Sequence, residues 1–292
     1  MATVLAIVVG IAGHTATEQA FPAAIAFDPA PASPLRIAYG TFPDTFGDLY
    51  LPTTGVGPYP VVVLIHGGGW SQNRTLEHVA PLALSLAQRG VAVWNIEYRR
   101  VDGAGGWPVT LTDVDDALTA LATIVNPKSG NRIDLQRVHL AGHSAGGQLA
   151  AWAAGRHTGF TDNRQTIAAV RIRSATLMAA VLDLVFAVNN GRDGFVRKLL
   201  GGLPDDVPDH YQLASPIAHL PHGVRISALH GDRDRVVSPD QSRRYVSAAT
   251  SAGESADLQI LDGIGHGEFA DVTSPAWRAA RETILDHAAM LR

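Results

Sequence analysis

Residues 137–152 read RVHLAGHSAGGQLAAW, an apolar run that ends in Gly142-His143-Ser144-Ala145-Gly146 and continues into a helix-forming run. A sharp turn from strand to helix forces its central residue into a strained backbone conformation. Only small residues two positions before and after the turn avoid a collision. Gly142 and Gly146 meet that requirement. We therefore predict a nucleophile elbow that exposes the Ser144 hydroxyl, with the unpaired N–H groups of a helix N-terminus behind it.

A second glycine-rich segment, His66-Gly67-Gly68-Gly69-Trp70, follows the apolar run Val61–Ile65. A continuous β-branched run is typical of a strand buried on both faces. Successive glycines let backbone N–H groups approach a ligand closely. Such a loop, with the N–H that follows the serine, stabilises the negative charge that develops on a substrate carbonyl oxygen. The predicted oxyanion donors are Gly67, Gly68 and Ala145.

A serine nucleophile also needs an acid and a base. Both are expected downstream of Ser144, because in sites built on a nucleophile elbow the order along the chain is serine, acid, histidine. Residues 230–237 read HGDRDRVV and residues 263–267 read GIGHG, and each follows an apolar run. We predict Asp234 as the acid, with Asp232 as a less favoured alternative, and His266 as the base. The imidazole would take the serine proton and pass it to the leaving group, while the carboxylate holds the imidazole in the required tautomer.

Between these motifs the chain alternates strand-like and helix-like segments, which predicts an α/β fold: a mostly parallel sheet of about eight strands, the early ones antiparallel, with helices on both faces. Thr110 and Asp113 form a capping-box pattern at the start of one helix, and Asp115 and Asp116 are interpreted as solvated surface. The expected strands are 61–65, 91–98, 137–141, 175–184, 225–229 and 258–262. The expected helices are 75–89, 110–125, 240–251 and 275–291.

The chain of 292 residues is predicted to hold a single domain at 36–292, preceded by an apolar segment and a Pro-rich linker at 1–35. The apolar run Val4–Ile11 has no basic residue before it, and it is shorter than the about 20 residues that span a bilayer. No stable membrane span is therefore expected. A cytoplasmic location is the expectation, and a secreted form is the less favoured alternative.

Composition narrows the kinds of partner. Residues are 46% hydrophobic and 17% charged with a net charge of −4, so a nucleic-acid partner is not expected. The chain has no cysteine, and its 12 histidines are scattered without an HExxH motif, so neither a metal nor another cofactor is predicted. The expected partner is a small-molecule ester substrate, and the sequence is compatible with a homodimer.

Selectivity in such a protein is expected to lie in an insertion over the strand ends. The segment at about 184–214 is too long for a plain connection, so we predict a small cap. Trp70, next to the glycine-rich loop, is the predicted substrate-binding residue. Trp107 and Phe195 would either line the same pocket or fill core and surface. Asn189, Asn190 and Arg192 would either bind a substrate carboxylate or serve as turn and surface residues.

From about residue 36 to its end, the chain resembles the α/β-hydrolases of the kynurenine formamidase and feruloyl/acetylxylan esterase type, neighbours of the hormone-sensitive-lipase-like esterases. The resemblance implies an α/β-hydrolase fold with Ser144, Asp234 and His266 as a catalytic triad, and Asp113 at a family position that braces a loop. The segments that carry it are Tyr39-Gly40, Asp48–Pro52, HGGGW at 66–70, Glu97–Arg99, Trp107-Pro108, GHSAGG at 142–147, Ala214–Pro216, HGDRDRVV at 230–237 and GIGHGE at 263–268.

The expected activity is that of a serine carboxylic ester hydrolase, which cleaves short-acyl or aryl esters through an acyl-enzyme because the predicted cap is small. Three alternatives stay open. The first is an arylformamidase, which would cleave an N-formyl amide of the N-formylkynurenine type. The second is an acyltransferase or other non-hydrolytic enzyme on the same fold. The third is a binding protein that has lost turnover, although all three triad residues are present.

Overall fold

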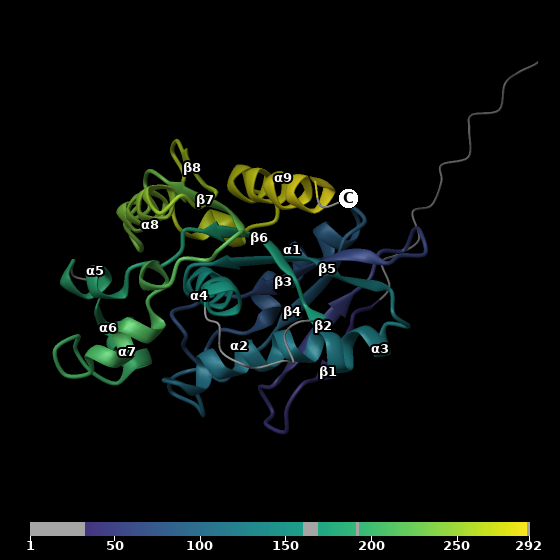
Figure 1. Cartoon of the computed structure of the whole chain (residues 1–292), viewed down its shortest axis with the longest axis horizontal. Coiled ribbons are helices and arrows are strands. Elements are labelled where there is room, and N and C mark those ends of the chain that lie inside the picture. The colour runs from purple at the N-terminus through teal and green to yellow at the C-terminus, as the bar shows by residue number, and fades with distance from the viewer. Residues whose placement is uncertain (1–32, 160–168, 191–192, 291–292) are drawn as a thin grey trace, which may run out of the picture. The chain divides into compact units, whose positions relative to one another are not determined.

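The computed structural model describes residues 33–159, 169–190 and 193–290, and its central element is an eight-stranded sheet (Figure 1). The strand order is β1-β2-β4-β3-β5-β6-β7-β8. The pairs β1/β2 and β2/β4 are antiparallel and the others are parallel, which confirms the predicted sheet. The strands are β1 (Leu35–Ala38), β2 (Phe46–Tyr50), β3 (Tyr59–Ile65), β4 (Ala92–Ile96), β5 (Ile133–His143), β6 (Ile172–Met178), β7 (Arg225–Gly231) and β8 (Ala256–Leu261).

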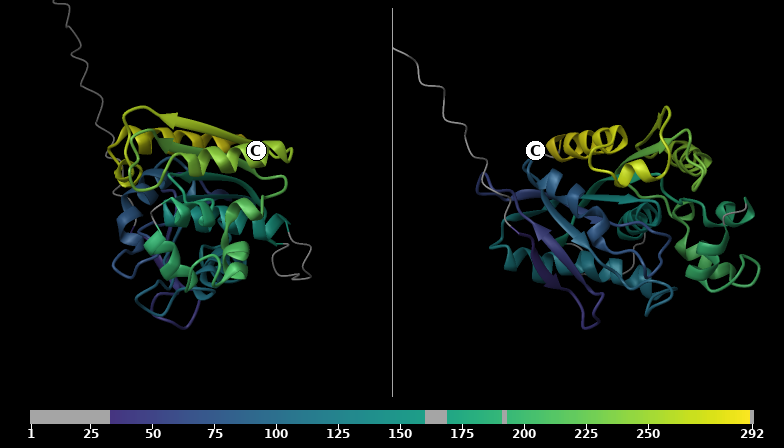
Figure 2. Two further views of the ribbon diagram at one scale, coloured as in Figure 1. Left: turned by 90° about the vertical axis from the view of Figure 1, so that its left-hand side faces the viewer. Right: turned by 180° about the vertical axis from the view of Figure 1, so that it is seen from behind.

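Helices cover both faces of this sheet, as predicted (Figures 1 and 2). The α-helices are α1 (Ala80–Ala87), α2 (Val109–Ala120), α3 (Asn126–Lys128), α4 (Ala145–Gly159), α5 (Leu184–Asn189), α6 (Asp193–Leu200), α7 (Pro208–Ala214), α8 (Asp240–Ser251) and α9 (Pro275–Met290). Short helices of other types are η1 (Leu76–Val79), η2 (Leu121–Val125), η4 (Pro216–Ala218) and η5 (Gly267–Ala270).

The core is divided by the sheet into two apolar layers. Successive side chains of a strand point to opposite faces. Val62 and Leu64 of β3 therefore pack with α1 and α9, while Val61 and Val63 pack with α2, α4 and α8. All four valine and leucine side chains are fully buried. A strand buried on both faces is what the continuous apolar run of β3 predicts.

The predicted strand at 175–184 extends too far toward the C-terminus, because β6 ends at Met178. Ala179 has a φ of 46°, in the left-handed region, and this turns the backbone out of the β ladder. Asp183 then serves as the N-cap of α5, where its carboxylate accepts a hydrogen bond from the Phe186 N–H.

The predicted capping box at Thr110 and Asp113 is also wrong, because α2 begins at Val109 and has no side-chain cap. The Thr110 hydroxyl donates to the Arg99 carbonyl oxygen at 2.6 Å instead. The Asp113 carboxylate accepts hydrogen bonds from the Arg99 backbone N–H, Nε and Nη2. Both side chains therefore tie the loop after β4 to the helix, which is the bracing role expected for Asp113.

The interpretation of Asp115 as solvated surface is wrong. Its side chain is only 14% exposed, and its Oδ1 lies 2.9 Å from Nε2 of His157 in α4. The pairing brings α2 and α4 together on one face of the sheet. Asp116, one position further along α2, is exposed as expected.

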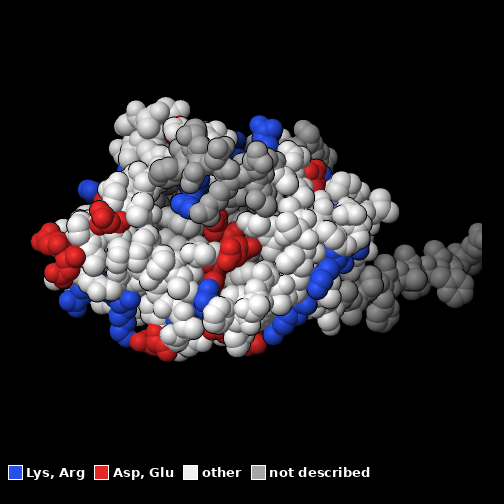
Figure 3. Space-filling view, turned by 60° about the horizontal axis from the view of Figure 1, so that its bottom comes forward, with Lys and Arg blue, Asp and Glu red and all other residues white. Residues whose placement is uncertain are grey.

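Helices α5, α6 and α7 occupy the segment where the cap is predicted, between β6 and β7, and Figure 1 shows them grouped at one end of the sheet. The N-terminal segment predicted at 1–35 lies outside the described residues apart from 33–35. None of the helices in the described part of the chain is long and apolar enough to cross a membrane. On the face shown in Figure 3, basic and acidic side chains are interspersed among uncharged ones.

Candidate active site

The turn between β5 and α4 has the geometry that the glycine spacing predicts. Ser144 has a φ of 56°, a left-handed conformation that is strained for a residue with a side chain. A Cβ atom on Gly142 would lie 2.2 Å from the Gly146 carbonyl oxygen, and one on Gly146 would lie 2.1 Å from the Ile65 carbonyl oxygen. Only glycine fits at either position, because these neighbours are backbone atoms that cannot move aside.

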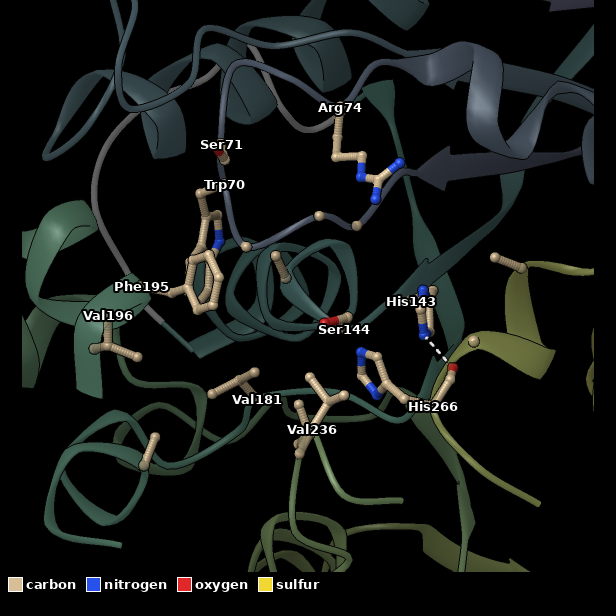
Figure 4. A pocket seen from close by; sticks show the side chains of 18 of the residues that line it. Trp70, Ser71, Arg74, His143, Ser144, Val181, Phe195, Val196, Val236 and His266 are labelled. Atoms are coloured by element: carbon tan, nitrogen blue, oxygen red, sulfur yellow. Dashed lines mark hydrogen bonds between the residues drawn. The ribbon is translucent and has the colours of Figure 1, made fainter. Parts of the chain in front are cut away.

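Ser144 lines a pocket with a volume of about 520 Å³ (Figure 4). The walls come from the loop after β3, the elbow itself, the inserted helices α5 and α6, the loop after β7 and the loop after β8. His266 lines the same pocket, and in Figure 4 its ring lies beside Ser144. The structure thus brings together two side chains that are separated by more than a hundred positions in the chain.

Asp234 lies behind His266 and receives hydrogen bonds on both of its oxygens. Oδ2 accepts from His266 Nδ1 at 2.7 Å and lies 3.2 Å from His230 Nε2. Oδ1 accepts from the backbone N–H groups of Val236 and Val237 at 2.8 and 2.9 Å. Burial acts to raise the pKa of Asp234, but the hydrogen bonds from His230, His266 and Val237 outweigh it and hold the pKa well below its usual range. The carboxylate is therefore ionised.

Asp232, the alternative acid, points elsewhere. It is exposed, and its Oδ1 accepts a hydrogen bond from the Gly263 N–H at 2.7 Å, which links the loops after β7 and β8. Of the two acids considered from the sequence, only Asp234 contacts His266.

His143, the residue before Ser144, contacts the His266 loop directly. Its Nε2–H donates to the His266 backbone carbonyl oxygen at 2.9 Å, the dashed line in Figure 4. Its ring lies 4.6 Å from the His266 ring and stacks on Phe269 at 6.2 Å. Burial lowers the pKa of His143 to about 3, so this side chain is neutral at ordinary pH. No role for His143 was predicted from the sequence, although its place inside the elbow motif was a signal.

The glycine-rich loop lies against the elbow. A Cβ atom on Gly67 would lie 2.6 Å from the His143 carbonyl oxygen, and Gly68 has a φ of 112°. In the described part of the chain, the N–H groups of Gly67, Gly68 and Ala145 donate no hydrogen bond to another residue. All three N–H groups belong to residues that line the pocket, where they can donate to a bound ligand.

A network of buried polar side chains contacts the backbone of the glycine-rich loop. His66 Nε2 lies 2.7 Å from Glu97 Oε1, and its Nδ1 lies 2.9 Å from the Gly67 carbonyl oxygen. The His66 ring stacks on Tyr98 at 4.4 Å, and the Tyr98 hydroxyl donates to the His66 carbonyl oxygen at 2.8 Å. Glu97 is also bonded to Arg100. The network holds the backbone of the glycine loop in place, and the sequence analysis did not foresee it.

The aromatic residues predicted near the pocket are placed differently from one another. Trp70 lines the pocket, but its side chain is only 1% exposed and its Nε1–H donates to Gln148 Oε1 at 3.0 Å. Phe195 of α6 lines the pocket and is 55% exposed. Trp107 is not among the lining residues. Its ring stacks on His210 of α7 at 5.0 Å and packs against the core, which agrees with the second of the two roles considered from the sequence.

The polar residues considered as carboxylate ligands in the inserted segment also differ in their positions. Asn190 lines the pocket, while Asn189 is exposed and does not line it. Arg192 lies outside the described residues. Of the two side chains described here that were considered as carboxylate ligands, only Asn190 lines the pocket.

The sheet order and the strained serine between a strand and a helix define an α/β-hydrolase. Residues 47–248 match the family model named BD-FAE, and the chain belongs to this family of α/β-hydrolases.

The chain is similar in sequence to proteins that are named as esterases or as kynurenine formamidase. The chain is 25% identical over 274 residues to a probable isoprenylcysteine alpha-carbonyl methylesterase, ICMEL2, of Arabidopsis thaliana (86% of this chain, 60% of that protein). It is 30% identical over 251 residues to esterase LipC of Mycobacterium tuberculosis (80% and 59%). It is 29% identical over 151 residues to kynurenine formamidase of Salmo salar (52% and 47%). The chain thus spans about 60% or less of the length of these relatives.

Solved structures support the fold. A truncated form of a carbohydrate esterase from gut microbiota superposes with a TM-score of 0.71 at 23% identity, over 87% of this chain and 95% of that chain. At such low identity the likeness concerns the arrangement of the sheet and helices, and it carries no information on substrate.

Proposed function

We propose that this protein is a serine hydrolase that cleaves short-acyl or aryl carboxylic esters through an acyl-enzyme. Ser144 is the nucleophile, His266 the general base and acid, and Asp234 the carboxylate that orients the imidazole. The observation that supports this most directly is the 2.7 Å hydrogen bond from His266 Nδ1 to Asp234, in a histidine that lines the same pocket as the strained Ser144.

In the proposed mechanism each proton has a donor and an acceptor. Because Nδ1–H of His266 donates to Asp234, the lone pair of a neutral imidazole is at Nε2 and accepts the Ser144 hydroxyl proton. The serine oxygen bonds to the ester carbonyl carbon, and the N–H groups of Gly67, Gly68 and Ala145 stabilise the resulting oxyanion. The tetrahedral intermediate collapses and expels the alcohol, which takes the proton from His266. Water then bonds to the acyl carbonyl carbon while His266 takes its proton. The bond from this carbon to Ser144 Oγ breaks, and His266 returns the proton to Oγ as the carboxylic acid leaves.

The pocket favours small substrates. Its volume of about 520 Å³ lies within the range of about 300–1,000 Å³ that is usual for small-ligand sites. Apolar side chains of the inserted helices, among them Ala187, Phe195 and Val196, form one wall. We therefore propose that α5 and α6 act as the predicted small cap, and that an acyl or aryl group binds against them.

A second candidate activity is hydrolysis of an N-formyl aryl amide, and the similarity to kynurenine formamidase favours it. The same steps apply, with attack on the formyl carbon and an aryl amine as the leaving group that His266 protonates. Ester and formamide activities are therefore to be compared on one preparation of the protein.

A fluorophosphonate probe and a substrate panel test the proposal together. The native protein is expected to be labelled covalently and Ser144→Ala is not, with Ser71→Ala, another serine of the pocket wall, as the matched control that keeps its label. The panel compares p-nitrophenyl acetate, butyrate and octanoate with an N-formyl aryl amide. Hydrolysis of the short esters is expected to be fastest. A native protein that is neither labelled nor active on any substrate would contradict the proposal.

A further inference from the structure

The segment that follows the glycine-rich loop provides a polar wall of the pocket, opposite in character to the cap. Ser71, Asn73, Arg74 and His78 all line the pocket from this segment. Among the described lining residues, Arg74 is the only Lys or Arg, and there is no Asp or Glu. The wall therefore carries one cation without a carboxylate beside it.

The stem of Arg74 is held against the proposed oxyanion loop. A Cβ atom on Gly68 would lie 2.2 Å from Arg74 Cγ and 2.4 Å from its Cβ, so the glycine leaves space for the arginine stem. The Arg74 backbone N–H donates to the Ser71 carbonyl oxygen at 3.1 Å. The arginine is thus fixed to the same loop that carries the N–H groups for the oxyanion.

The guanidinium group of Arg74 contacts the imidazole ring of His78. Its Nη1 lies 2.8 Å from His78 Nε2, and because a guanidinium can only donate, Nε2 of the imidazole accepts. His78 Nδ1 lies 3.2 Å from the Thr75 carbonyl oxygen and 3.4 Å from the Thr75 backbone nitrogen, so the ring is held against the backbone of Thr75. His78 thus orients Arg74 without neutralising it. No described carboxylate forms a salt bridge with Arg74, and its remaining N–H groups are open to a ligand.

The far wall differs from the Arg74 side. Val181 and Val236 line the pocket there, and Figure 4 shows Ser144 between these two apolar side chains and Arg74. Phe195 and Val196 of α6 line a side wall, where the Phe195 ring lies against Gly69. A substrate that is complementary to both walls has an apolar part that packs against the valines, an ester bond at Ser144, and an anionic group near Arg74.

Building on the proposed function, we propose that the preferred substrates are esters that also carry a free carboxylate, which Arg74 binds. A guanidinium presents its N–H groups in a planar fork that matches the two oxygens of a carboxylate. Because Arg74 is exposed, the ion pair is partly screened by water and salt, and we expect a preference of about tenfold rather than several hundredfold.

Matched pairs of substrates test this inference. The first pair is 4-acetoxybenzoate and 4-acetoxybenzamide, which place the carboxylate or its neutral isostere on the leaving group. The second pair is monomethyl adipate and methyl adipamate, which place it on the acyl side. In the native protein, kcat/KM is expected to favour the carboxylate in one pair by about tenfold at low salt. In Arg74→Met that ratio is expected to fall close to one, and in Arg74→Lys to an intermediate value.

The control is Arg278→Met, which removes an exposed arginine of α9 outside the pocket and changes the net charge equally. It is expected to keep the native ratio. Native protein without a carboxylate preference in either pair, or a preference that persists in Arg74→Met, would overturn the inference.

Binding of benzoate and benzamide, measured by calorimetry, needs no turnover and separates this inference from the proposed hydrolysis. Tighter binding of benzoate that is lost in Arg74→Met supports the carboxylate site even if no ester is cleaved. Equal binding of the two compounds, together with rapid hydrolysis of neutral esters, refutes the carboxylate site and leaves the proposed function intact.

Discussion

Replacing Asp234 by asparagine should impair catalysis while it preserves most contacts of the residue. Oδ1 of the asparagine can still accept the N–H groups of Val236 and Val237, which now lie at 2.8 and 2.9 Å. The amide nitrogen takes the place of Oδ2, which now accepts from His266 Nδ1 at 2.7 Å. An amide N–H donates only, so His266 must accept at Nδ1 and carry its proton on Nε2.

That tautomer cannot take the proton of Ser144, because the lone pair of the imidazole faces away from the serine. The loss of the required tautomer in a serine–histidine–carboxylate site costs about 10⁴ in kcat, equivalent to about 5.5 kcal/mol of transition-state stabilisation. We expect a loss of this order in Asp234→Asn with a folded protein. The assay is steady-state hydrolysis of p-nitrophenyl butyrate, with circular dichroism and thermal unfolding to confirm the fold.

Asp232→Asn is the matched control, because it makes the same chemical change two residues away. Asp232 is exposed and its asparagine substitute can still accept from the Gly263 N–H, so we expect kcat within about twofold of the native value. The reasoning is refuted if the folded Asp234→Asn variant keeps more than a tenth of the native kcat. A greater loss in Asp232→Asn than in Asp234→Asn would refute it as well.

Further predictions concern the same site. Ser144→Ala and His266→Ala should each lower kcat by several orders of magnitude and the double variant little more, because the residues act as a unit; near-additive losses in single-turnover assays would contradict this. Gly146→Ala should prevent folding or abolish activity, since its Cβ would lie 2.1 Å from a carbonyl oxygen, whereas Gly194→Ala, with nothing within 4 Å, should behave like the native protein in thermal unfolding and activity assays. Because His143 has a pKa of about 3 when folded and about 6.5 when unfolded, unfolding takes up a proton below pH 6.5, and stability falls as the pH is lowered. Urea unfolding at pH 7 and pH 5 should show about 2 kcal/mol less loss of stability in His143→Phe than in the native protein, and equal losses would show that His143 titrates normally in the folded state.

The contact of His143 with the His266 loop leads to a further prediction, that His143 positions His266. Its Nε2–H donates to the His266 carbonyl oxygen, so His143→Phe is expected to lower kcat by about five- to 150-fold, the equivalent of about 1–3 kcal/mol, with little change in KM. His143→Gln retains an N–H donor and should recover part of the loss. If His143→Phe and His143→Gln have the same kcat, the hydrogen bond from residue 143 does not position His266.

Features that depend on a few neighbouring residues were predictable from the sequence. The elbow at Ser144 follows from glycine at positions 142 and 146, because the collisions that exclude larger residues are local. Helix α8 begins at Asp240 and ends at Ser251, the bounds expected from the sequence. The end of β6 at Met178 was missed, because the apolar run continues past the residue where the backbone turns.

Contacts between distant segments were not predictable in this way. Asp113 matches a capping pattern, but its carboxylate binds Arg99 from the loop after β4. Trp107 is an aromatic residue near the expected pocket, yet it stacks on His210 of α7. Each side chain had several partners of suitable chemistry in the sequence, and packing of the helices on the sheet selected one.

The sequence by itself determined the fold class, the strained serine and the glycine loop, since backbone sterics and hydrophobic periodicity act over a few residues. Only the tertiary structure decided that Asp234 rather than Asp232 meets His266, and that His143 and His230 support them. It also decided that Arg74 lines the pocket with no Asp or Glu among the other described lining residues. The physical reason is that these contacts join loops at the ends of different strands. Their separation in space depends on the register and twist of the whole sheet.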